Sequence, residues 1–185
     1  MSRFAEKYRI ESPRLGNWDY SSPGNYFITI CTANHNTFFG KIINHQIEYS
    51  KRGQIAVDCL NEIPKHFLNI KLLESIVMPN HVHLLVNLSQ LRSNSVETHD
   101  RASLPIRYQS YHYHRLAIKS NQTIPKIISQ YKSSVTRLIN PKTILFAWQP
   151  GFYDEIITSD KRLFAIKKYI HNNILNWQKD KLYFN

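Results

Sequence analysis

The segment LLESIVMPNHVHLLVN, residues 72–87, determines the fold that we expect for this chain. It contains two apolar runs, 72–78 and 81–87, separated only by Pro79-Asn80, a pair that is typical of turns. Both runs are rich in residues that favour strands. Two apolar strands this close in sequence should pair as an antiparallel hairpin in the middle of a sheet.

His81 and His83 lie two positions apart in the second run, so their side chains should leave the same face of a strand. Two imidazoles at this spacing can bind one metal ion. Val82 and Leu84 would then point to the opposite face, where an apolar layer should cover them. Most His-x-His pairs are structural, but imidazoles at two positions of an otherwise apolar strand favour a metal site here.

The rest of the chain alternates between strand-like and helix-like patterns. We expect strands at 25–32 and 152–158, a hairpin of 38–43 with 46–49 around Asn44-His45, a helix from Gly53 that ends near Pro64, a helix over 124–139, and a helix capped by Asp160 that runs to about His171. The order predicts an α+β, ferredoxin-like βαββαβ fold, an antiparallel sheet with helices on one face. Around this domain, 25–158, we expect a polar N-terminal arm, 1–24, and a C-terminal helical extension, 159–185.

Residues 88–122 show little periodicity and are rich in polar and basic residues, which predicts a long basic loop. His112 and His114 within it repeat the spacing of the first histidine pair. No apolar strand would fix their geometry, so we interpret them as facing nucleic acid or solvent.

Basic residues outnumber acidic ones, with 24 Lys and Arg against 13 Asp and Glu, for a formal net charge of +11. Such an excess attracts polyanions, of which nucleic acid is the commonest in the cytosol. Aromatic residues make up 12% of the chain, and a minority of the rings are expected to stack on unpaired bases. No apolar run approaches the roughly 20 residues that cross a bilayer, and the N-terminus lacks a secretory signal. We therefore expect a cytoplasmic protein with no membrane partner.

Tyr131 lies on the apolar stripe of the helix expected at 124–139, so it should face the sheet. A tyrosine on such a stripe is usually a core residue. It becomes a candidate for chemistry only if the sheet face that it meets carries His81 and His83.

Three ordered segments resemble the single-tyrosine HUH transposases, and more closely the REP-associated tyrosine transposases: MPNHVH at 78–83, QYKSSVTR at 130–137 and AWQPGFYDEII at 147–157. YIHNN at 169–173, with Trp177, resembles the C-terminal extension of that subgroup. The resemblance runs from about Asn25 to the C-terminus, with 88–122 as the variable part.

The resemblance implies a nucleoid-associated enzyme that nicks and rejoins single-stranded DNA, often beside a REP-like hairpin, through a 5′-phosphotyrosine. His81 and His83 would bind a divalent metal, Mg²⁺ or Mn²⁺, which polarises the scissile phosphate. Tyr131 would attack the phosphorus and release a 3′-OH. Lys132 and Arg137 would contact phosphates, although they are as readily interpreted as solvated charges on the helix.

One position departs from the family pattern. Insertion-sequence relatives carry a polar third metal ligand one turn after the tyrosine, where this chain has Val135. Gln149, Asp154 and Glu155 are then candidates for the third ligand, with water or a degenerate site as alternatives. Val135 also keeps open a second interpretation, a non-catalytic protein that binds hairpin DNA or RNA. The family contains monomers and homodimers, and the C-terminal resemblance favours a monomer.

Overall fold

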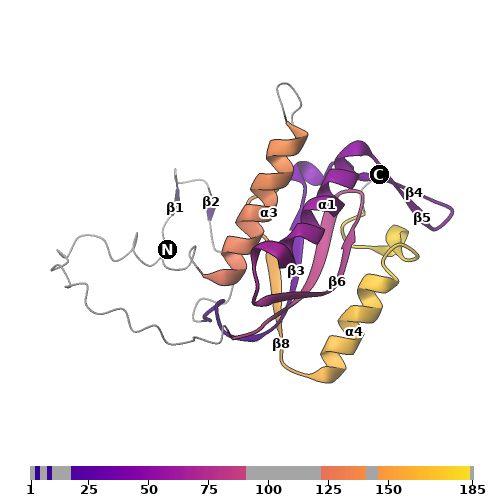
Figure 1. Ribbon diagram of the computed structural model, residues 1–185. Helices are drawn as coiled ribbons and strands as arrows, with labels where there is room; N and C mark the ends of the chain where they lie inside the picture. The colour runs from indigo at the N-terminus through magenta and orange to yellow at the C-terminus, as the bar shows by residue number, and fades with distance from the viewer. Residues whose placement is uncertain (1–2, 5–7, 10–17, 91–121, 141–145, 184–185) are drawn as a thin grey trace, which may run out of the picture.

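The computed structural model describes residues 3–4, 8–9, 18–90, 122–140 and 146–183 (Figure 1). Most of the predicted loop, including His112 and His114, lies outside these residues. The elements in chain order are β1 (Arg3–Phe4), β2 (Tyr8–Arg9), β3 (Gly24–Cys31), η1 (Ala33–His35), β4 (Gly40–Ile43), β5 (Gln46–Tyr49), α1 (Lys51–His66), β6 (Ile70–Val77), β7 (His81–Leu88), α3 (Thr123–Ile139), β8 (Tyr153–Ile157), α4 (Asp160–His171) and η2 (Trp177–Lys179).

Four strands form one antiparallel sheet in the order β6-β7-β3-β8. The central pair runs from His81 opposite Cys31 to Leu88 opposite Gly24. Helix α1 connects β3 to β6 by way of the β4-β5 hairpin, and α3 precedes the edge strand β8. This is the predicted α+β arrangement with ferredoxin-like strand order. The two apolar runs pair as the expected antiparallel hairpin, but only β7 lies in the middle of the sheet, because β6 is an edge strand.

Helices α1 and α3 cover one face of the sheet, which we call the helix-pair face (Figure 1). Val82 and Leu84 of β7 point to this face and belong to the main core, as predicted. The apolar stripe of α3 packs here, with Tyr131 and Val135 both buried. Apolar helix surface therefore meets the apolar side of the central strands, which removes it from water.

Helix α4 packs on the opposite face, which we call the α4 face. Its Ile166 and Ile170 form a second, smaller core with Leu85 of β7 and Ile157 of β8. Because side chains alternate along a strand, Leu85 shares its face with His81 and His83. The C-terminal helix therefore lies on the histidine side of the sheet.

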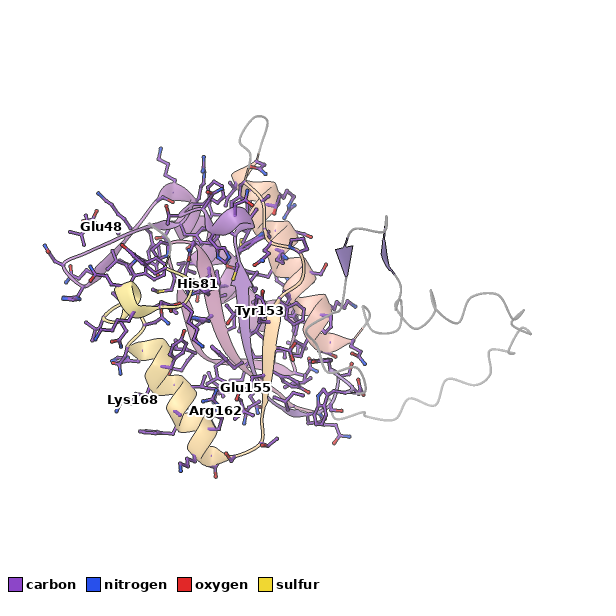
Figure 2. All side chains as sticks on the ribbon, turned by 180° about the vertical axis from the view of Figure 1, so that it is seen from behind. Glu48, His81, Tyr153, Glu155, Arg162 and Lys168 are labelled. Atoms are coloured by element: carbon purple, nitrogen blue, oxygen red, sulfur yellow. The ribbon has the colours of Figure 1, made fainter. Side chains whose placement is uncertain are left out.

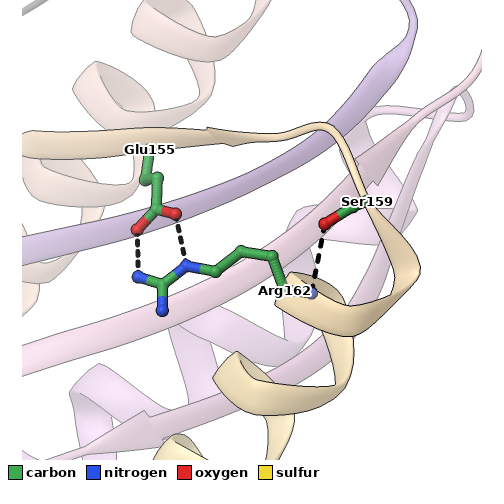
Figure 3. Close-up of polar contacts among 3 residues, drawn as sticks. All are labelled: Glu155, Ser159 and Arg162. Carbon is green, nitrogen blue, oxygen red and sulfur yellow. Dashed lines mark hydrogen bonds and ion pairs between the residues drawn. The ribbon is translucent and has the colours of Figure 1, made fainter.

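Two local contacts fix the start of α4 (Figure 3). Ser159 accepts a hydrogen bond from the backbone N–H of Arg162, so Ser159 is the cap and the predicted cap, Asp160, is the first helical residue. The guanidinium of Arg162 donates two hydrogen bonds of 2.6 Å to the carboxylate of Glu155 on β8. Both side chains are partly exposed, so this pair contributes at most about 1 kcal/mol to stability, but its two-point geometry holds α4 to β8.

The β4-β5 hairpin turns at Asn44 and His45, as predicted. Both residues have positive φ angles, 49° and 60°, which two-residue hairpin turns of this type require. Among the residues that the structure describes, none of the helices is long and apolar enough to cross a bilayer.

Candidate metal and tyrosine site

His81 and His83 are buried on the α4 face, and their Nε2 atoms lie 3.0 Å apart. The predicted convergence of the two imidazoles is therefore present. Two ring nitrogens this close require a proton on one of them or a cation bound to both. The strand supplies the pair from a rigid element, because β7 is hydrogen-bonded on both sides, to β6 and β3.

Neighbouring side chains set the orientation of both rings. The Asn80 amide donates to two carbonyl oxygens, of His35 at 3.2 Å and of Leu182 at 2.7 Å, which fixes its Oδ1 toward His81. The Nδ1–H of His81 therefore donates to Asn80 Oδ1, at 2.8 Å, and its Nε2 keeps a lone pair. The Nδ1 of His83 is hydrogen-bonded to Thr29 Oγ1, also at 2.8 Å. Such partners on the second nitrogen are what metal-binding histidines commonly have.

Burial also sets the charge of the two histidines. Loss of solvation lowers the pKa of His81 well below its ordinary value, and the neighbouring His83 and His35 lower it further. Burial lowers the pKa of His83 to about 4, against an opposing effect of Asp180. Both imidazoles are therefore neutral at neutral pH, the form that binds metal.

Asp180, which follows η2, completes a group of three metal-ligating residues with His81 and His83. One ligand atom from each residue lies within 4.8 Å of the others. The backbone N–H of Leu182 donates to Asp180 Oδ1 at 2.7 Å and fixes the carboxylate. Imidazole and carboxylate ligands together suit a divalent metal ion.

The hydroxyl of Tyr169, a residue of α4, contacts two members of this metal-ligating group. The hydroxyl donates to Asp180 Oδ2 at 3.2 Å and lies 3.3 Å from His83 Nε2. Burial and then the charge of Asp180 raise the pKa of Tyr169 to about 12, so its hydroxyl is protonated at neutral pH. The side chain is still 43% exposed, and a large substrate can reach it.

Asn173 lies one turn after Tyr169. Its Nδ2 donates to Asp180 Oδ2 at 3.3 Å. Its Oδ1 is buried and has no hydrogen-bond partner among the described residues. A buried amide oxygen without a partner is costly, and a cation held by the same cluster would satisfy it.

The expectation that Tyr131 meets the histidines is wrong. Tyr131 is 2% exposed and lies on the helix-pair face, whereas His81 and His83 lie on the α4 face. Its hydroxyl donates to the backbone oxygen of Ala56 in α1 at 3.1 Å, and burial raises its pKa well above the ordinary value. Val135 is part of the same core, on the face of the sheet opposite to the histidines.

We expect Tyr131→Phe to lower the free energy of unfolding by about 1 kcal/mol, the usual contribution of one hydrogen bond. The ring and its packing are retained, so the fold should persist. Urea denaturation measures the change. An unfolding midpoint equal to that of the unmodified protein would contradict a structural role for this hydroxyl.

The candidates for a third ligand are distributed around the sheet. Asp154 accepts a hydrogen bond from Tyr20 on the helix-pair face, and Glu155 is held by Arg162. Neither belongs to the metal-ligating group found among the described residues, in which Asp180 takes that place. The backbone N–H of Gln149 donates to the backbone oxygen of Cys31, and its buried Oε1 has no hydrogen-bond partner among the same residues.

Lys132 and Arg137, the predicted phosphate contacts, come from α3. The Lys132 ammonium donates to the backbone oxygens of Gln149 and Gly151, at 2.7 and 3.0 Å. Arg137 lines a small groove between α1 and α3 with Tyr131. The structure does not bring either residue to the histidines.

The sequence contains the signal that points to Tyr169. The family pattern expects a polar residue one turn after the tyrosine, and Tyr131 fails this requirement because of Val135. Tyr169 meets it with Asn173, within the segment that we assigned to the C-terminal extension.

Asn80→Ala should lower the affinity for Mn²⁺ by about 10- to 100-fold, because loss of an orienting partner has this effect on metal sites. Asn80→Asp keeps an oxygen for His81 Nδ1 and should retain more affinity than the alanine variant. Isothermal titration of each variant with Mn²⁺ measures the difference, after thermal melting has established that each is folded. Equal affinities for the unmodified protein and Asn80→Ala would contradict the orienting role.

A cavity of about 790 Å³ opens beside Tyr169, between α4, the strands β3 and β8, and the segment after η2. Figure 2 shows this side of the molecule, with Tyr153 and Glu155 on β8 and with Arg162 and Lys168 on α4. His83 and Tyr169 both line the cavity, so the candidate site adjoins it directly.

Comparison with known proteins gives a relative in sequence and solved structures that resemble this fold. No family model matches the chain. An uncharacterized protein of Haemophilus influenzae is 32% identical over 173 residues, which cover 93% of this chain and 92% of that protein. A REP-associated tyrosine transposase, solved bound to a REP hairpin, superposes with a TM-score of 0.56 at 14% identity, covering 98% of this chain and 77% of the other.

The two comparisons establish different things. The sequence relative shows common descent along nearly the whole chain. The structural neighbour shows the architecture. The chain therefore belongs to one protein family with the uncharacterized Haemophilus influenzae protein, and its fold is that of the HUH tyrosine transposases.

Proposed function

We propose that this protein is a transposase-type enzyme that nicks and rejoins single-stranded DNA, with Tyr169 as the nucleophile. One observation carries the proposal. The Tyr169 hydroxyl lies 3.3 Å from His83 Nε2 and 3.2 Å from Asp180 Oδ2, in a cluster built like a metal site. A tyrosine fixed beside metal ligands at the mouth of a large cavity suits attack on a phosphodiester.

The residues present fit a divalent cation, and Mg²⁺ or Mn²⁺ is the choice for phosphoryl chemistry. His81, His83 and Asp180 would hold it, and Asn173 offers the partnerless Oδ1 described above. When bound, such an ion supplies Lewis-acid polarisation of a scissile phosphate oxygen. This ligand set replaces Gln149, Asp154 and Glu155 as sources of the third ligand.

The chemistry of the chain's own residues then follows from their contacts. The Tyr169 oxygen attacks the phosphorus, the new bond is a 5′-phosphotyrosine, and the bond to the 3′ oxygen breaks. Asp180 already accepts a hydrogen bond from the Tyr169 hydroxyl and is positioned to accept its proton. The released 3′ oxygen takes up a proton and leaves as a 3′-OH. Attack by a 3′-OH on the phosphotyrosine reverses these steps and joins strands without ATP.

The substrate class rests on charge and on the structural neighbour. The chain carries a net charge of +11, which favours a polyanion, and the neighbour was solved bound to a REP hairpin. Hairpin-flanked single-stranded DNA in the cytoplasm, at the nucleoid, is thus the proposed target. Because one chain supplies both the histidines and Tyr169, we expect a monomer to be sufficient.

A covalent-adduct assay tests the proposal. The protein is incubated with end-labelled single-stranded DNA carrying hairpins and with Mn²⁺, and the label that stays on the protein after denaturation is measured. We expect an adduct that disappears when EDTA is present. No adduct across substrates with varied flanking sequences would favour a non-catalytic hairpin-binding protein. Val135 no longer favours that alternative, because it belongs to the core of the helix-pair face.

A further inference from the structure

Tyr153 lies in one cross-strand row with the candidate site. In the sheet, Tyr153 of β8 is opposite Thr29 of β3, and Thr29 is opposite His83 of β7. Directly opposite residues of antiparallel strands share a face, so Tyr153 is on the α4 face. Two strand spacings separate it from His83, about 10 Å. A nucleotide next to the scissile phosphate can span this distance.

The Tyr153 ring is available to a ligand. It comes from the edge strand and is 52% exposed, although it lines the cavity. Figure 2 shows it on β8, on the same side as α4. An exposed aromatic ring at the edge of a cavity provides a flat surface of the kind on which unpaired bases stack.

Part of the cavity lining is suited to a base and not to a phosphate. Phe27, Ala165 and Ile166 contribute apolar side chains to it. A phosphate gains nothing from such surface, because it must keep hydrogen bonds and charge partners. The cavity of about 790 Å³ also exceeds what the phosphate at His83 and Tyr169 needs.

Cationic side chains in the cavity lining supply contacts for a strand that enters the cavity. Lys168, Lys179 and Lys181 line it. Arg162 lines it too, and its two hydrogen bonds to Glu155 hold the guanidinium in a fixed position (Figure 3). Phosphates on either side of a bound base would therefore meet positive charge.

The geometry points to a nucleobase-binding site in this cavity: Tyr153 stacks on an unpaired base of the nucleotide beside the scissile phosphate. The inference rests on the proposed function for the identity of the substrate. It adds to that function a residue that selects for unpaired bases. A base within a duplex cannot present its face to Tyr153, so the site discriminates against paired DNA.

The test compares two probes in EDTA, where no cleavage occurs: labelled oligothymidylate, and an abasic strand of equal length and charge. Fluorescence anisotropy gives the affinity of each variant for each probe. Tyr153→Ala should weaken binding of oligothymidylate by about 5- to 150-fold, since stacking on one base contributes roughly 1–3 kcal/mol. Tyr153→Phe keeps the ring and should bind like the unmodified protein. Phe164→Ala, which removes an exposed aromatic ring of α4 outside the cavity, is the matched control and should change nothing.

The abasic probe decides between base contact and other effects. The unmodified protein and Tyr153→Ala should bind it equally. A loss of affinity for both probes in Tyr153→Ala, or for neither, would overturn the inference. Loss of base-dependent binding in Tyr153→Ala without any covalent adduct in the cleavage assay would keep the site and overturn the nicking activity. A covalent adduct together with equal oligothymidylate binding by Tyr153→Ala and the unmodified protein would keep the nicking activity and overturn the base-binding site.

Discussion

Tyr169→Phe should abolish the covalent protein–DNA adduct, with a loss of about a thousandfold or more, because removal of a nucleophile leaves only binding and electrostatic effects. The variant loses one hydroxyl and keeps the ring. That hydroxyl bonds Asp180 and reaches His83 at the surface of the cavity, so its loss should not unfold the protein. The measurement is labelled DNA that stays on the denatured protein.

Tyr131→Phe is the matched control for this experiment. It makes the same chemical change on the other face of the sheet, where the hydroxyl bonds Ala56. Adduct formation by this variant should remain near that of the unmodified protein once its small loss of stability is taken into account. A Tyr169→Phe protein that still forms adducts, with Tyr131→Phe inactive, would restore the assignment made from the sequence.

His81→Ala and His83→Ala should each remove metal-dependent cleavage and weaken Mn²⁺ binding by more than about a hundredfold. Loss of a partner in the outer shell already costs 10- to 100-fold, and these variants remove a ligand itself. Each leaves a buried gap next to the other histidine, so some loss of stability accompanies the effect. Isothermal titration with Mn²⁺ and the adduct assay give separate readings.

His66→Ala is the control for the histidine variants. His66 is an exposed histidine at the end of α1, and its removal should change neither reading. Normal Mn²⁺ affinity in both His81→Ala and His83→Ala would remove the metal site from the account. Cleavage by either variant at the rate of the unmodified protein would also remove the metal site from the account.

The sheet and the histidines could be predicted from the sequence because strand side chains alternate with a fixed period. The segment 72–87 identified the β6-β7 hairpin, and its period of two placed His81 and His83 on one face with Val82 and Leu84 on the other. These features depend only on local spacing, and the structure confirms them.

The tyrosine could not be assigned in the same way. The apolar stripe of 124–139 predicts that Tyr131 is buried against the sheet, but not against which face. Physical chemistry favours the face of Val82 and Leu84, since apolar surface packs on apolar surface. That is the face without the histidines, so burial of Tyr131 on its stripe argues against the role that the family resemblance gave it.

Asp180 had no local signal in the sequence. It lies beyond the last helix, and only the path of the chain after η2 brings its carboxylate to His83 and Tyr169. Contacts such as Asn80 to the backbone of Leu182, 102 positions apart, fix that path. Long-range pairings of this kind leave no periodic trace in a single sequence.

Mass spectrometry of the adduct tests the central claim most directly. The protein is incubated with hairpin-flanked single-stranded DNA and Mn²⁺, digested with protease and nuclease, and searched for peptides that carry a nucleotide phosphate. The account predicts that the modification lies on Tyr169. A nucleotide phosphate on Tyr131, or on any residue other than Tyr169, would contradict it.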